Sequence, residues 1–391
     1  MPVSRHLAEL MKGSSWIRRM FEEGARLRAE RGADAVFDFS LGNPVLEPPE
    51  GVLEAFRAAL DDPAPGLHRY MQNAGYPEVR RAVASFLQQD FGEEFSADRV
   101  VMCVGAGGGL NVVLKSILDS GDEVVVLAPY FPEYAFYVDN HGGRMVVVPT
   151  GKDFRPDAAA VEAALTSRTA AVIVNSPNNP TGIVYPQSDL DEIGAALRRH
   201  RERTGRVVHL VSDEPYRRIL FDGLEPASVF KAWEASILVT SHSKDLALPG
   251  ERIGVIAIGP RCPDATALAG ALTFSTRTLG FVNAPALQQR AVARLQGRTV
   301  DPEIYRRKRD RICGALQGMG YEFERPGGAF YLFPRAPGGD DVAFVQRLLR
   351  ECILVVPGSG FGAPGWFRLA YCVADREIEG ALPGFERAVR G

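Results

Sequence analysis

Short apolar runs alternate with amphipathic stretches between about residues 99 and 259. The runs at 122–128, 206–212 and 253–258 have the length and composition of buried strands, and residues 187–203 have the spacing of an amphipathic helix. Strands that alternate with helices in this way form a mostly parallel sheet with helices on its faces. The pattern therefore predicts an α/β fold with functional side chains at the carboxyl ends of the strands.

The pattern changes beyond about residue 283. A long helical tract is predicted from there to residue 315. Short strands follow around residues 330–333 and 367–371, and a helix near residues 342–351 lies between them. This order of elements is typical of a smaller α+β unit.

We predict two domains. The large domain takes residues 45–285, and the small domain combines residues 1–44 with residues 286–391. Residues 14–27 have the pattern of an amphipathic helix at the start of the small domain. Movement of the small domain against the large one would close the cleft between them and exclude water.

Composition and charge exclude several classes of protein. The chain has 391 residues, 46% of them hydrophobic, and a formal net charge of -3, so nothing attracts it at long range to nucleic acids or anionic membranes. It contains no apolar run long enough to span a bilayer and no secretory segment. Its five cysteines are scattered, without a Cys-x-x-Cys pair or a metal-ligand spacing. A reduced, cytoplasmic protein without a metal site is expected.

Lys244 is the first candidate for chemistry. It follows the apolar run at residues 236–240, so its amine would lie just beyond the end of a buried strand. Partial desolvation and neighbouring positive charge lower the pKa of such an ammonium group and make it a Schiff-base nucleophile. A single loop lysine is usually solvated, so the hypothesis needs companion residues.

Three further strand ends carry polar or glycine-rich segments. Asp213 ends the apolar run at residues 207–212, and Tyr216 follows three residues later. Asn179 lies in a Pro- and Gly-rich turn after another apolar run. The glycine-rich segment 105–109 follows a third strand and opens a helix, and the free backbone N–H groups at a helix N-terminus bind phosphate.

One cofactor would use all of these groups: pyridoxal 5'-phosphate, an aldehyde-bearing pyridine with a phosphate arm. Its aldehyde needs a lysine, here Lys244, and its ring nitrogen needs a carboxylate, here Asp213. Tyr216 and Asn179 offer hydrogen-bond donors for the ring oxygen. Segment 105–109 offers the phosphate site. Charge pairing in a poorly hydrated cleft is much stronger than in water, so the carboxylate should be essential.

The motifs that carry these residues resemble those of the class I/II aminotransferases, in the aspartate aminotransferase superfamily of pyridoxal phosphate-dependent fold type I. They occur in that family's order and approximate spacing, between Leu41 and Arg368. The resemblance implies a mostly parallel, seven-stranded-type sheet wrapped by helices for the large domain. The motifs are Asn179-Pro-Thr-Gly, Ser212-Asp-Glu-Pro-Tyr216, Ser241-His-Ser-Lys244, Arg252-Ile-Gly and Phe367-Arg368-Leu-Ala.

The resemblance also implies roles around the cofactor ring. Lys244 would form the internal aldimine and then move the proton between the substrate Cα and the cofactor. Asp213 would pair with the ring nitrogen, and Tyr216 and Asn179 would donate to the ring oxygen. Phe131 falls where the family places an aromatic side chain stacked on the ring, with ordinary core packing as the alternative.

At the phosphate end, the resemblance implies that the backbone of three small residues cradles the phosphate. These are Ala106, Gly107 and Gly108, where the family often has hydroxyl side chains. Their lack of hydroxyl groups leaves more of the phosphate binding to Ser241, to Arg252 and to the helix N-terminus.

The remaining correspondences concern the substrate and the partner subunit. Tyr70 resembles the tyrosine that reaches the phosphate of the neighbouring subunit, which implies a homodimer with shared active sites. Arg368 resembles the arginine that binds the substrate α-carboxylate with its planar guanidinium. Gly42 and Asn179 are expected beside the same carboxylate.

We therefore predict an aminotransferase that moves an amino group from an L-amino acid to a 2-oxo acid. The nearest alternative is another pyridoxal phosphate reaction (β-elimination, decarboxylation, racemisation or carbon–carbon condensation), because all of them share Lys244 and Asp213. An NAD-dependent dehydrogenase would use segment 105–109, but Leu110 stands where its third glycine belongs. A non-catalytic regulator would need an additional effector or DNA-binding segment, for which no length is spare.

The amino donor stays open at this point. Dicarboxylate-specific members of the family often carry a second arginine for the distal carboxylate. Arg277 is a candidate for that clamp, and a surface or dimer-interface position is at least as plausible for it.

Overall fold

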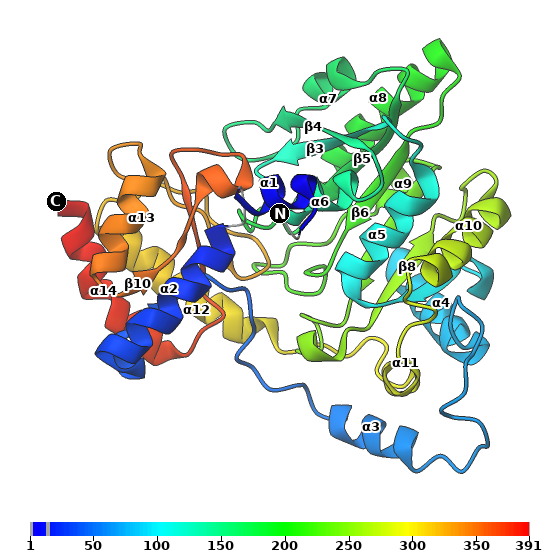
Figure 1. Ribbon diagram of the computed structural model, residues 1–391, viewed down its shortest axis with the longest axis horizontal. Coiled ribbons are helices and arrows are strands. Elements are labelled where there is room, and N and C mark those ends of the chain that lie inside the picture. The colour runs from blue at the N-terminus through cyan, green and yellow to red at the C-terminus, as the bar shows by residue number, and fades with distance from the viewer. Residues whose placement is uncertain (1–2, 13–15, 391) are drawn as a thin grey trace.

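The structure, a computed structural model, describes residues 3–12 and 16–390. Figure 1 shows two lobes, of which one is built around a large sheet and the other holds the C-terminal helices together with part of the N-terminal segment. The described C-terminal end of the chain lies at the outer end of the second lobe.

Seven strands form the large sheet. Strand β8 is antiparallel to both of its neighbours, and all other neighbouring strands are parallel. The predicted mostly parallel α/β sheet is therefore confirmed. In their order across the sheet, the strands are β2 (Val100–Cys103), β8 (Gly254–Ile258), β7 (Ser236–Ser241), β6 (His209–Asp213), β5 (Thr169–Asn175), β3 (Glu123–Ala128) and β4 (Arg144–Pro149).

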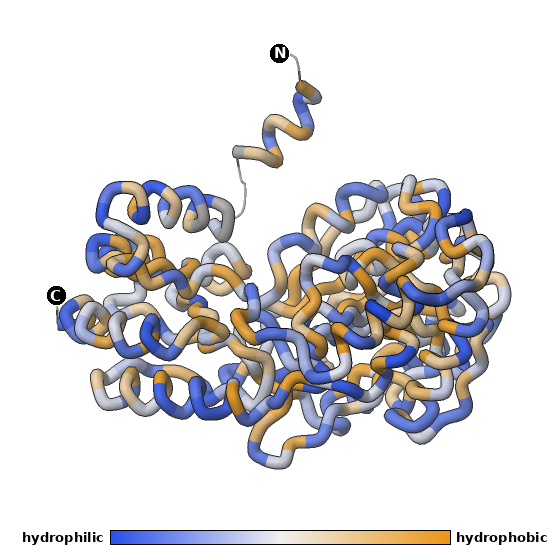
Figure 2. Tube along the Cα trace, turned by 90° about the horizontal axis from the view of Figure 1, so that it is seen from below, coloured by the Kyte–Doolittle hydropathy of each residue, from blue (hydrophilic) through white to orange (hydrophobic). Residues whose placement is uncertain are grey.

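Side chains of the large sheet alternate between two buried faces. In β3, Val124 and Val126 belong to one hydrophobic cluster, whereas Val125 and Leu127 belong to another. A continuous run of β-branched residues such as this one is typical of a parallel strand that is covered on both sides. Figure 2 shows apolar positions gathered in the interior of this lobe.

Helices cover the sheet and form most of the second lobe, and short polar residues set several of their ends. The side chains of Asp301 and Asp340 cap two helices by accepting backbone N–H bonds, and Gly205 ends another in the left-handed conformation. The helices of the sheet lobe are α3 (Val52–Leu60), α4 (Pro77–Phe91), α5 (Gly105–Ile117), α6 (Glu133–Asp139), α7 (Ala158–Ala164), α8 (Gln187–Thr204), α9 (Val229–Ala232), α10 (Ala265–Thr278) and α11 (Ala286–Ala293). The others are α1 (Arg5–Lys12), α2 (Trp16–Arg31), α12 (Pro302–Gly318), α13 (Asp341–Arg350) and α14 (Asp375–Arg390).

A small sheet and a strand pair organise the second lobe. Strand β12 (Phe367–Ala370) lies between β11 (Val356–Pro357) and β9 (Tyr331–Leu332), antiparallel to both. Strand β1 (Phe37–Asp38) pairs in parallel with β10 (Ile353–Leu354). This pairing joins the N-terminal segment to the C-terminal part of the chain.

The predicted continuous helical tract from residue 283 to residue 315 is wrong as a single element. Helix α11 ends at Ala293, and α12 begins only at Pro302. Gly297 between them has a φ of 82°. A proline fits the first turn of a helix but removes a hydrogen bond inside one, so Pro302 marks a new start rather than a continuation.

The N-terminal segment contains two helices. The predicted amphipathic helix at 14–27 corresponds to α2, although residues 14 and 15 lie outside the described residues. Helix α1 precedes it, and the ring of His6 on α1 lies 2.7 Å from the carboxylate of Asp139 on α6. Within 3–12 and 16–390, no helix has the length and apolar content needed to cross a membrane.

Candidate active site

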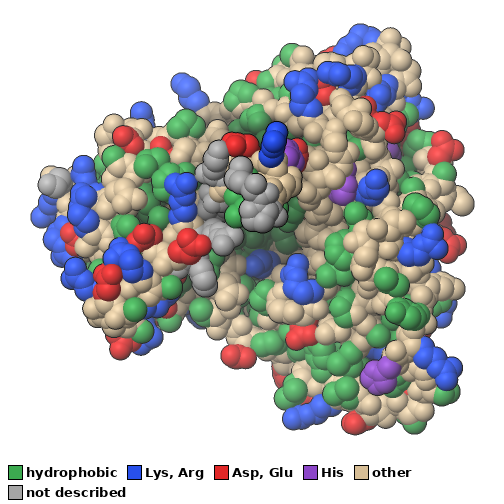
Figure 3. Space-filling view, in the orientation of Figure 1, with side chains coloured by type: hydrophobic (Ala, Val, Ile, Leu, Met, Phe, Trp, Pro, Cys, Tyr) green, Lys and Arg blue, Asp and Glu red, His purple; other side chains and the backbone are tan. Residues whose placement is uncertain are grey.

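A pocket lies at the carboxyl ends of the parallel strands. Asn175, Asp213 and Ser241 line it, and they are the last residues of β5, β6 and β7. Asn175 and Asp213 are direct partners across the sheet. Parallel strands deliver their last residues to one edge of the sheet, so the position of the pocket follows from the topology. Figure 3 shows the molecule hollowed between the two lobes.

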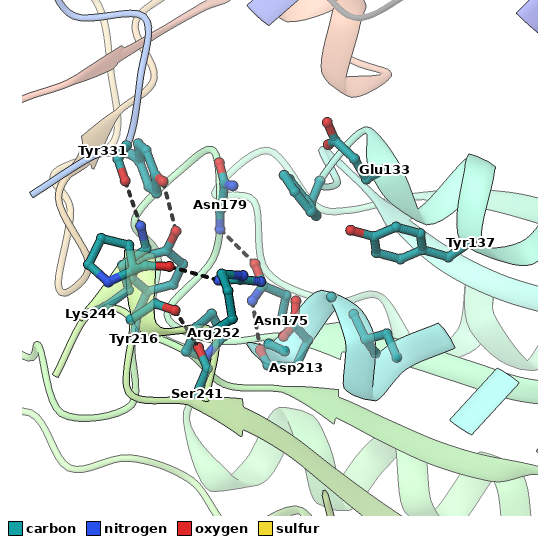
Figure 4. A pocket seen from close by; sticks show the side chains of 18 of the residues that line it. Glu133, Tyr137, Asn175, Asn179, Asp213, Tyr216, Ser241, Lys244, Arg252 and Tyr331 are labelled. Carbon is teal, nitrogen blue, oxygen red and sulfur yellow. Dashed lines mark hydrogen bonds between the residues drawn. The ribbon is translucent and has the colours of Figure 1, made fainter. Parts of the chain in front are cut away.

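Most of the predicted site residues line this pocket together (Figure 4). Gly42 comes from the N-terminal segment and Arg368 from β12, so both lobes contribute. Two predicted residues, Gly108 and Tyr70, do not line it. The predicted residues that do are Gly42, Ala106, Gly107, Phe131, Asn179, Asp213, Tyr216, Ser241, Lys244, Arg252 and Arg368.

The carboxylate of Asp213 lies at the floor of the pocket with one oxygen satisfied and one unpaired. Tyr134 donates a hydrogen bond of 2.6 Å to Oδ2, whereas Oδ1 is buried and has no hydrogen-bond partner among the described residues. Burial raises the pKa of this carboxyl to about 7. A buried acceptor without a donor is costly, so the site suits a ligand that carries a protonated ring nitrogen.

Lys244 extends into the pocket from the loop that follows β7. Its Nζ donates a hydrogen bond of 2.6 Å to the carbonyl oxygen of Gly42. Burial lowers the pKa of its ammonium group to about 8, and the positive charges of Arg252 and Arg368 act in the same direction, against the Cys372 thiol. A substantial fraction of the amine is therefore neutral near physiological pH, as a nucleophile or a general base requires.

Hydroxyl and amide groups lie between these two residues. The Tyr216 and Tyr331 hydroxyls are 2.7 Å apart, and both tyrosines are buried. The backbone N–H of Asn179 donates to Oδ1 of Asn175 over 2.7 Å, and the amide of Asn175 donates to the Asp213 carbonyl over 2.7 Å. These bonds fix the strand ends relative to one another and direct the side chains of Tyr216 and Asn179 into the pocket (Figure 4).

The start of α5 forms a compact cradle at one end of the pocket. Gly105 has a φ of 67°, and a Cβ added there would collide with the guanidinium of Arg252. A Cβ added at Gly107 would lie 2.8 Å from the hydroxyl of Tyr137. Ser241 also lines the pocket, and its Oγ donates to Ser243 Oγ over 3.2 Å. The N–H groups at the N-terminus of α5, the guanidinium of Arg252 and the hydroxyls of Ser241 and Tyr137 together suit a phosphate.

Arg368 is almost wholly buried, with 2% of its surface exposed. One guanidinium nitrogen donates to Asn179 Oδ1 over 3.1 Å, and another donates to the carbonyl oxygen of Ser40. The guanidinium lies 4.8 Å from the ring centres of both Tyr331 and Phe361. Its Nε has no partner in the described part of the chain. The arginine is therefore rigidly held and still offers a donor to a carboxylate.

Phe131 lines the pocket and contacts Tyr134 edge to face, with ring centres 5.6 Å apart. Gly108 lies one residue beyond the cradle, where an added Cβ would contact Val104 and Phe281 instead of the pocket. Tyr70 is 88% exposed. Phe131 is therefore part of the pocket, whereas Gly108 and Tyr70 are not.

Arg277 does not line the pocket. It is exposed on α10, where its guanidinium lies 5.2 Å from the centre of the Phe274 ring. Of the two positions considered for Arg277, the protomer has the one at the surface.

The sequence interpretation missed several residues that line the pocket. Asn175 carries the same signal as Asp213, a polar residue that ends an apolar run, and could have been found. Glu133 and Tyr137 are four residues apart on α6, which places them on one helix face, but a short helix with a mostly apolar sequence gives no sign of which face lines a pocket. Tyr331 carries no signal, because only the pairing of β9 with β12 brings it here.

The fold and the pocket define an α/β enzyme built to hold an aldehyde-bearing, phosphorylated pyridine. A family model, "Aminotransferase class I and II", matches residues 34–383. The chain belongs to this family. It is an aminotransferase, and class I and II aminotransferases use pyridoxal phosphate as their cofactor. No group of three His, Cys, Asp or Glu that could hold a metal occurs in the described ranges.

The similarity to known proteins covers nearly the whole chain. The chain is 35% identical to the aspartate/prephenate aminotransferase of Thermus thermophilus, with 92% of each chain covered. It is 30% identical to aromatic-amino-acid aminotransferase 2 of Thermococcus litoralis, with 97% of each covered. An amino transferase structure from Eubacterium rectale superimposes with a TM-score of 0.96 at 36% identity, covering 100% of this chain and 99% of that one.

Proposed function

We propose that this aminotransferase moves an amino group from an L-amino acid to a 2-oxo acid in the pocket described above, with Lys244 as the proton carrier. The observation that carries the assignment is the unpaired, buried oxygen of Asp213 in the same pocket as the amine of Lys244 and the guanidinium of Arg368. The three groups match the ring nitrogen, the reacting carbon and the carboxylate of such a reaction.

The proposed roles at the reacting end follow from charge and protonation. Pyridoxal phosphate, when bound, supplies an electron-withdrawing ring that stabilises negative charge at the donor Cα. The Asp213 carboxylate would keep a proton on the ring nitrogen, and Tyr216 and Asn179 would donate hydrogen bonds to the ring oxygen. Lys244 Nζ would accept the proton from Cα, and its pKa of about 8 suits that exchange near neutral pH.

The proposed substrate contacts involve both lobes. Arg368 would bind the α-carboxylate, since its rigid guanidinium keeps an unpaired Nε. Gly42 would lie against the same group, because its carbonyl already contacts Lys244 and a side chain there would collide with Tyr331. Phe131 would pack on the cofactor ring, and closure of the small lobe would exclude water.

For the phosphate we propose the backbone of Ala106 and Gly107 with the side chains of Ser241 and Arg252, all of which line the pocket, whereas the predicted Gly108 lies one residue further along α5 and does not line it. To these we add Tyr137, whose hydroxyl reaches the position that a side chain of Gly107 would occupy. Tyr137 would supply from α6 the hydroxyl group that the glycine-rich segment lacks.

Tyr137→Phe should weaken cofactor binding. A hydrogen bond to a charged phosphate is worth about 1.5–3 kcal/mol, so the dissociation constant for pyridoxal phosphate should rise about 10-fold or more. The constant can be measured by titrating cofactor-free protein and following absorbance. Tyr130→Phe is the matched control, because Tyr130 is on the same segment but does not line the pocket. Equal constants for Tyr137→Phe and the wild type would exclude this contact.

We also propose a homodimer in which Tyr70 reaches the phosphate of the partner's site. Tyr70, Phe274 and Leu53 are among the large apolar side chains that remain exposed on one protomer, at 88%, 57% and 57%. Such side chains are typical of surfaces that a partner covers. A molar mass of one 42.6 kDa chain in light scattering would count against the dimer.

We also propose the division into a large and a small domain that was predicted at residues 45–285 and at residues 1–44 with 286–391, but with the second boundary beyond α11, because Ala291 and Val292 belong to the hydrophobic cluster of the large sheet. It is supported by a hydrophobic cluster that unites Phe39 with Ile312 and Phe385 from the far end of the chain. If the first cleavage sites in limited proteolysis lay far from both domain boundaries, this division would be contradicted. A cytoplasmic location is supported by five cysteines that are all free, and cell fractionation would test it.

The reaction itself is tested with holoenzyme and one amino acid in the absence of an acceptor. Transamination should convert the bound cofactor stoichiometrically from its aldehyde form to its amine form, which absorbance reports. Release of ammonia, carbon dioxide or the D-amino acid with the aldehyde form retained would assign another reaction. The names of the two relatives make aspartate and aromatic amino acids the first donors to try.

A further inference from the structure

Glu133 places a carboxylate in the pocket that the reaction proposed above does not use. It is the first residue of α6 and lines the pocket with Tyr137. One of its oxygens, Oε2, is buried and has no hydrogen-bond partner in residues 3–12 and 16–390. Figure 4 shows Glu133 on the side of the pocket away from Lys244 and Tyr331.

The cations of the pocket are already engaged elsewhere. Among its described lining residues they are Lys244, Arg252 and Arg368, for which the aldehyde, the phosphate and the α-carboxylate are proposed. None of them forms an ion pair with Glu133, and Arg277 lies outside the pocket. An acidic donor side chain would therefore approach the carboxylate of Glu133, and no further cation of this protomer lines the described part of the pocket to offset the repulsion.

The electrostatics of Glu133 point to a missing positive partner. Burial raises the pKa of its carboxyl, and a hydrogen bond from its own backbone N–H and the charge of Arg368 only partly offset this effect. In a poorly hydrated pocket an unpaired carboxylate is costly, whereas a cation within contact distance restores its charged form. A ligand with a terminal amine or guanidinium group would supply that cation.

We propose that Glu133 selects amino donors whose side chain ends in a cationic amine or guanidinium group. With the α-carboxylate on Arg368 and the Cα beside Lys244, the donor side chain would extend toward α6 and Glu133. The inference rests on the proposed transamination, because it uses the same placement of the donor. It predicts a preference opposite to that for a dicarboxylic donor.

Glu133 has a second potential role, since it influences Arg368 through space. If it only adjusted Arg368, its removal would affect every donor by the same factor, because all donors share the α-carboxylate. A selector of the side chain would instead change the ratio between donors. The ratio is therefore the quantity to measure.

The test compares lysine, norleucine and glutamate as single donors for holoenzyme, with kcat/KM taken from the conversion of the bound cofactor. The wild type should favour lysine over norleucine, and Glu133→Gln should reduce that preference about 10- to 100-fold while it improves glutamate. Asp139→Asn, on the same helix but not lining the pocket, should leave all three donors unchanged. An equal change for all donors, or a wild-type preference for glutamate, would overturn the proposal.

Binding of unreactive ligands separates this inference from the reaction. Hexanoate, 6-aminohexanoate and adipate have the same chain length and differ only in the end group, so titration of holoenzyme with each needs no turnover. Wild-type protein should bind 6-aminohexanoate most tightly, and Glu133→Gln should abolish that advantage. If this holds but no amino acid converts the cofactor, the reaction is wrong and the selection stands. If hexanoate and 6-aminohexanoate bind equally, the selection fails whatever the reaction.

Discussion

Lys244→Ala should stop amino transfer almost completely. In the proposed reaction, the variant loses both the amine that would capture the aldehyde and the base that would accept the Cα proton. Proton transfer by a placed base contributes up to about 10⁴-fold and nucleophilic catalysis adds to it, so the rate of the half-reaction should fall by at least about 10⁴-fold. The measurement is the conversion of bound cofactor by an amino acid, followed for hours by absorbance.

The matched control is Lys152→Ala, because Lys152 is exposed and does not line the pocket. It should react like the wild type. Borohydride treatment of cofactor-loaded wild-type protein should attach the cofactor to the peptide that contains Lys244 and to no other. Attachment elsewhere, or a Lys244→Ala variant with appreciable turnover, would remove this residue from the centre of the mechanism.

Asp213→Asn should have the second largest effect. The substitution keeps the shape and the hydrogen bond from Tyr134 within reach but removes the charge that is proposed to keep the ring nitrogen protonated. Loss of one well-placed electrostatic group in a water-poor site costs about 10²–10³-fold in kcat. The half-reaction rate should fall by that factor or more, while cofactor remains covalently bound to Lys244.

Tyr134→Phe is the control that separates charge from position. It removes the 2.6 Å hydrogen bond to Oδ2 of Asp213 but keeps the carboxylate, so it should slow the half-reaction far less than Asp213→Asn does. Equal losses in the two variants would mean that the placement of Asp213, and not its charge, sets the rate.

Asp213→Asn should also change the stability of the cofactor-free protein in a pH-dependent way. The pKa of Asp213 is raised to about 7 from about 3.9 in an unfolded chain, so the folded protein binds more protons between these values. Wild-type stability is therefore lost as the pH rises through this range. Cofactor-free Asp213→Asn should melt above the wild type at about pH 8, and the difference should shrink toward about pH 5.

Part of the site could be predicted because sequence and topology coincide there. Asp213 ends an apolar run, Lys244 follows another, and the glycines at 105–109 follow a third. Because the carboxyl ends of parallel strands meet at the same edge of the sheet, residues that follow these ends lie close together even when they are far apart in sequence. Asn175 obeys the same rule, since it is the polar last residue of β5, and the sequence contains the signal needed to predict it.

Other parts depend on packing that no local pattern encodes. Tyr331 reaches Tyr216 only because β9 pairs with β12 across the second lobe. Glu133 and Tyr137 line the pocket because of the position of α6 in the tertiary structure, and the sequence of this short, mostly apolar helix does not show which of its faces meets a pocket. The break between α11 and α12 interrupts the predicted continuous tract because Gly297 has a positive φ and Pro302 begins a new helix, although the apolar spacing continues across both.

The amino-acid sequence by itself determined the strand and helix order, the polar strand ends and the glycine cradle, because periodicity and chain reversal are local properties of the backbone. Only the tertiary structure decided which side chains surround the lysine, how Arg368 is buried, and that a carboxylate from α6 with one unpaired oxygen lines the pocket. Those features arise from desolvation and from contacts between distant segments, which exist only once the two lobes pack together.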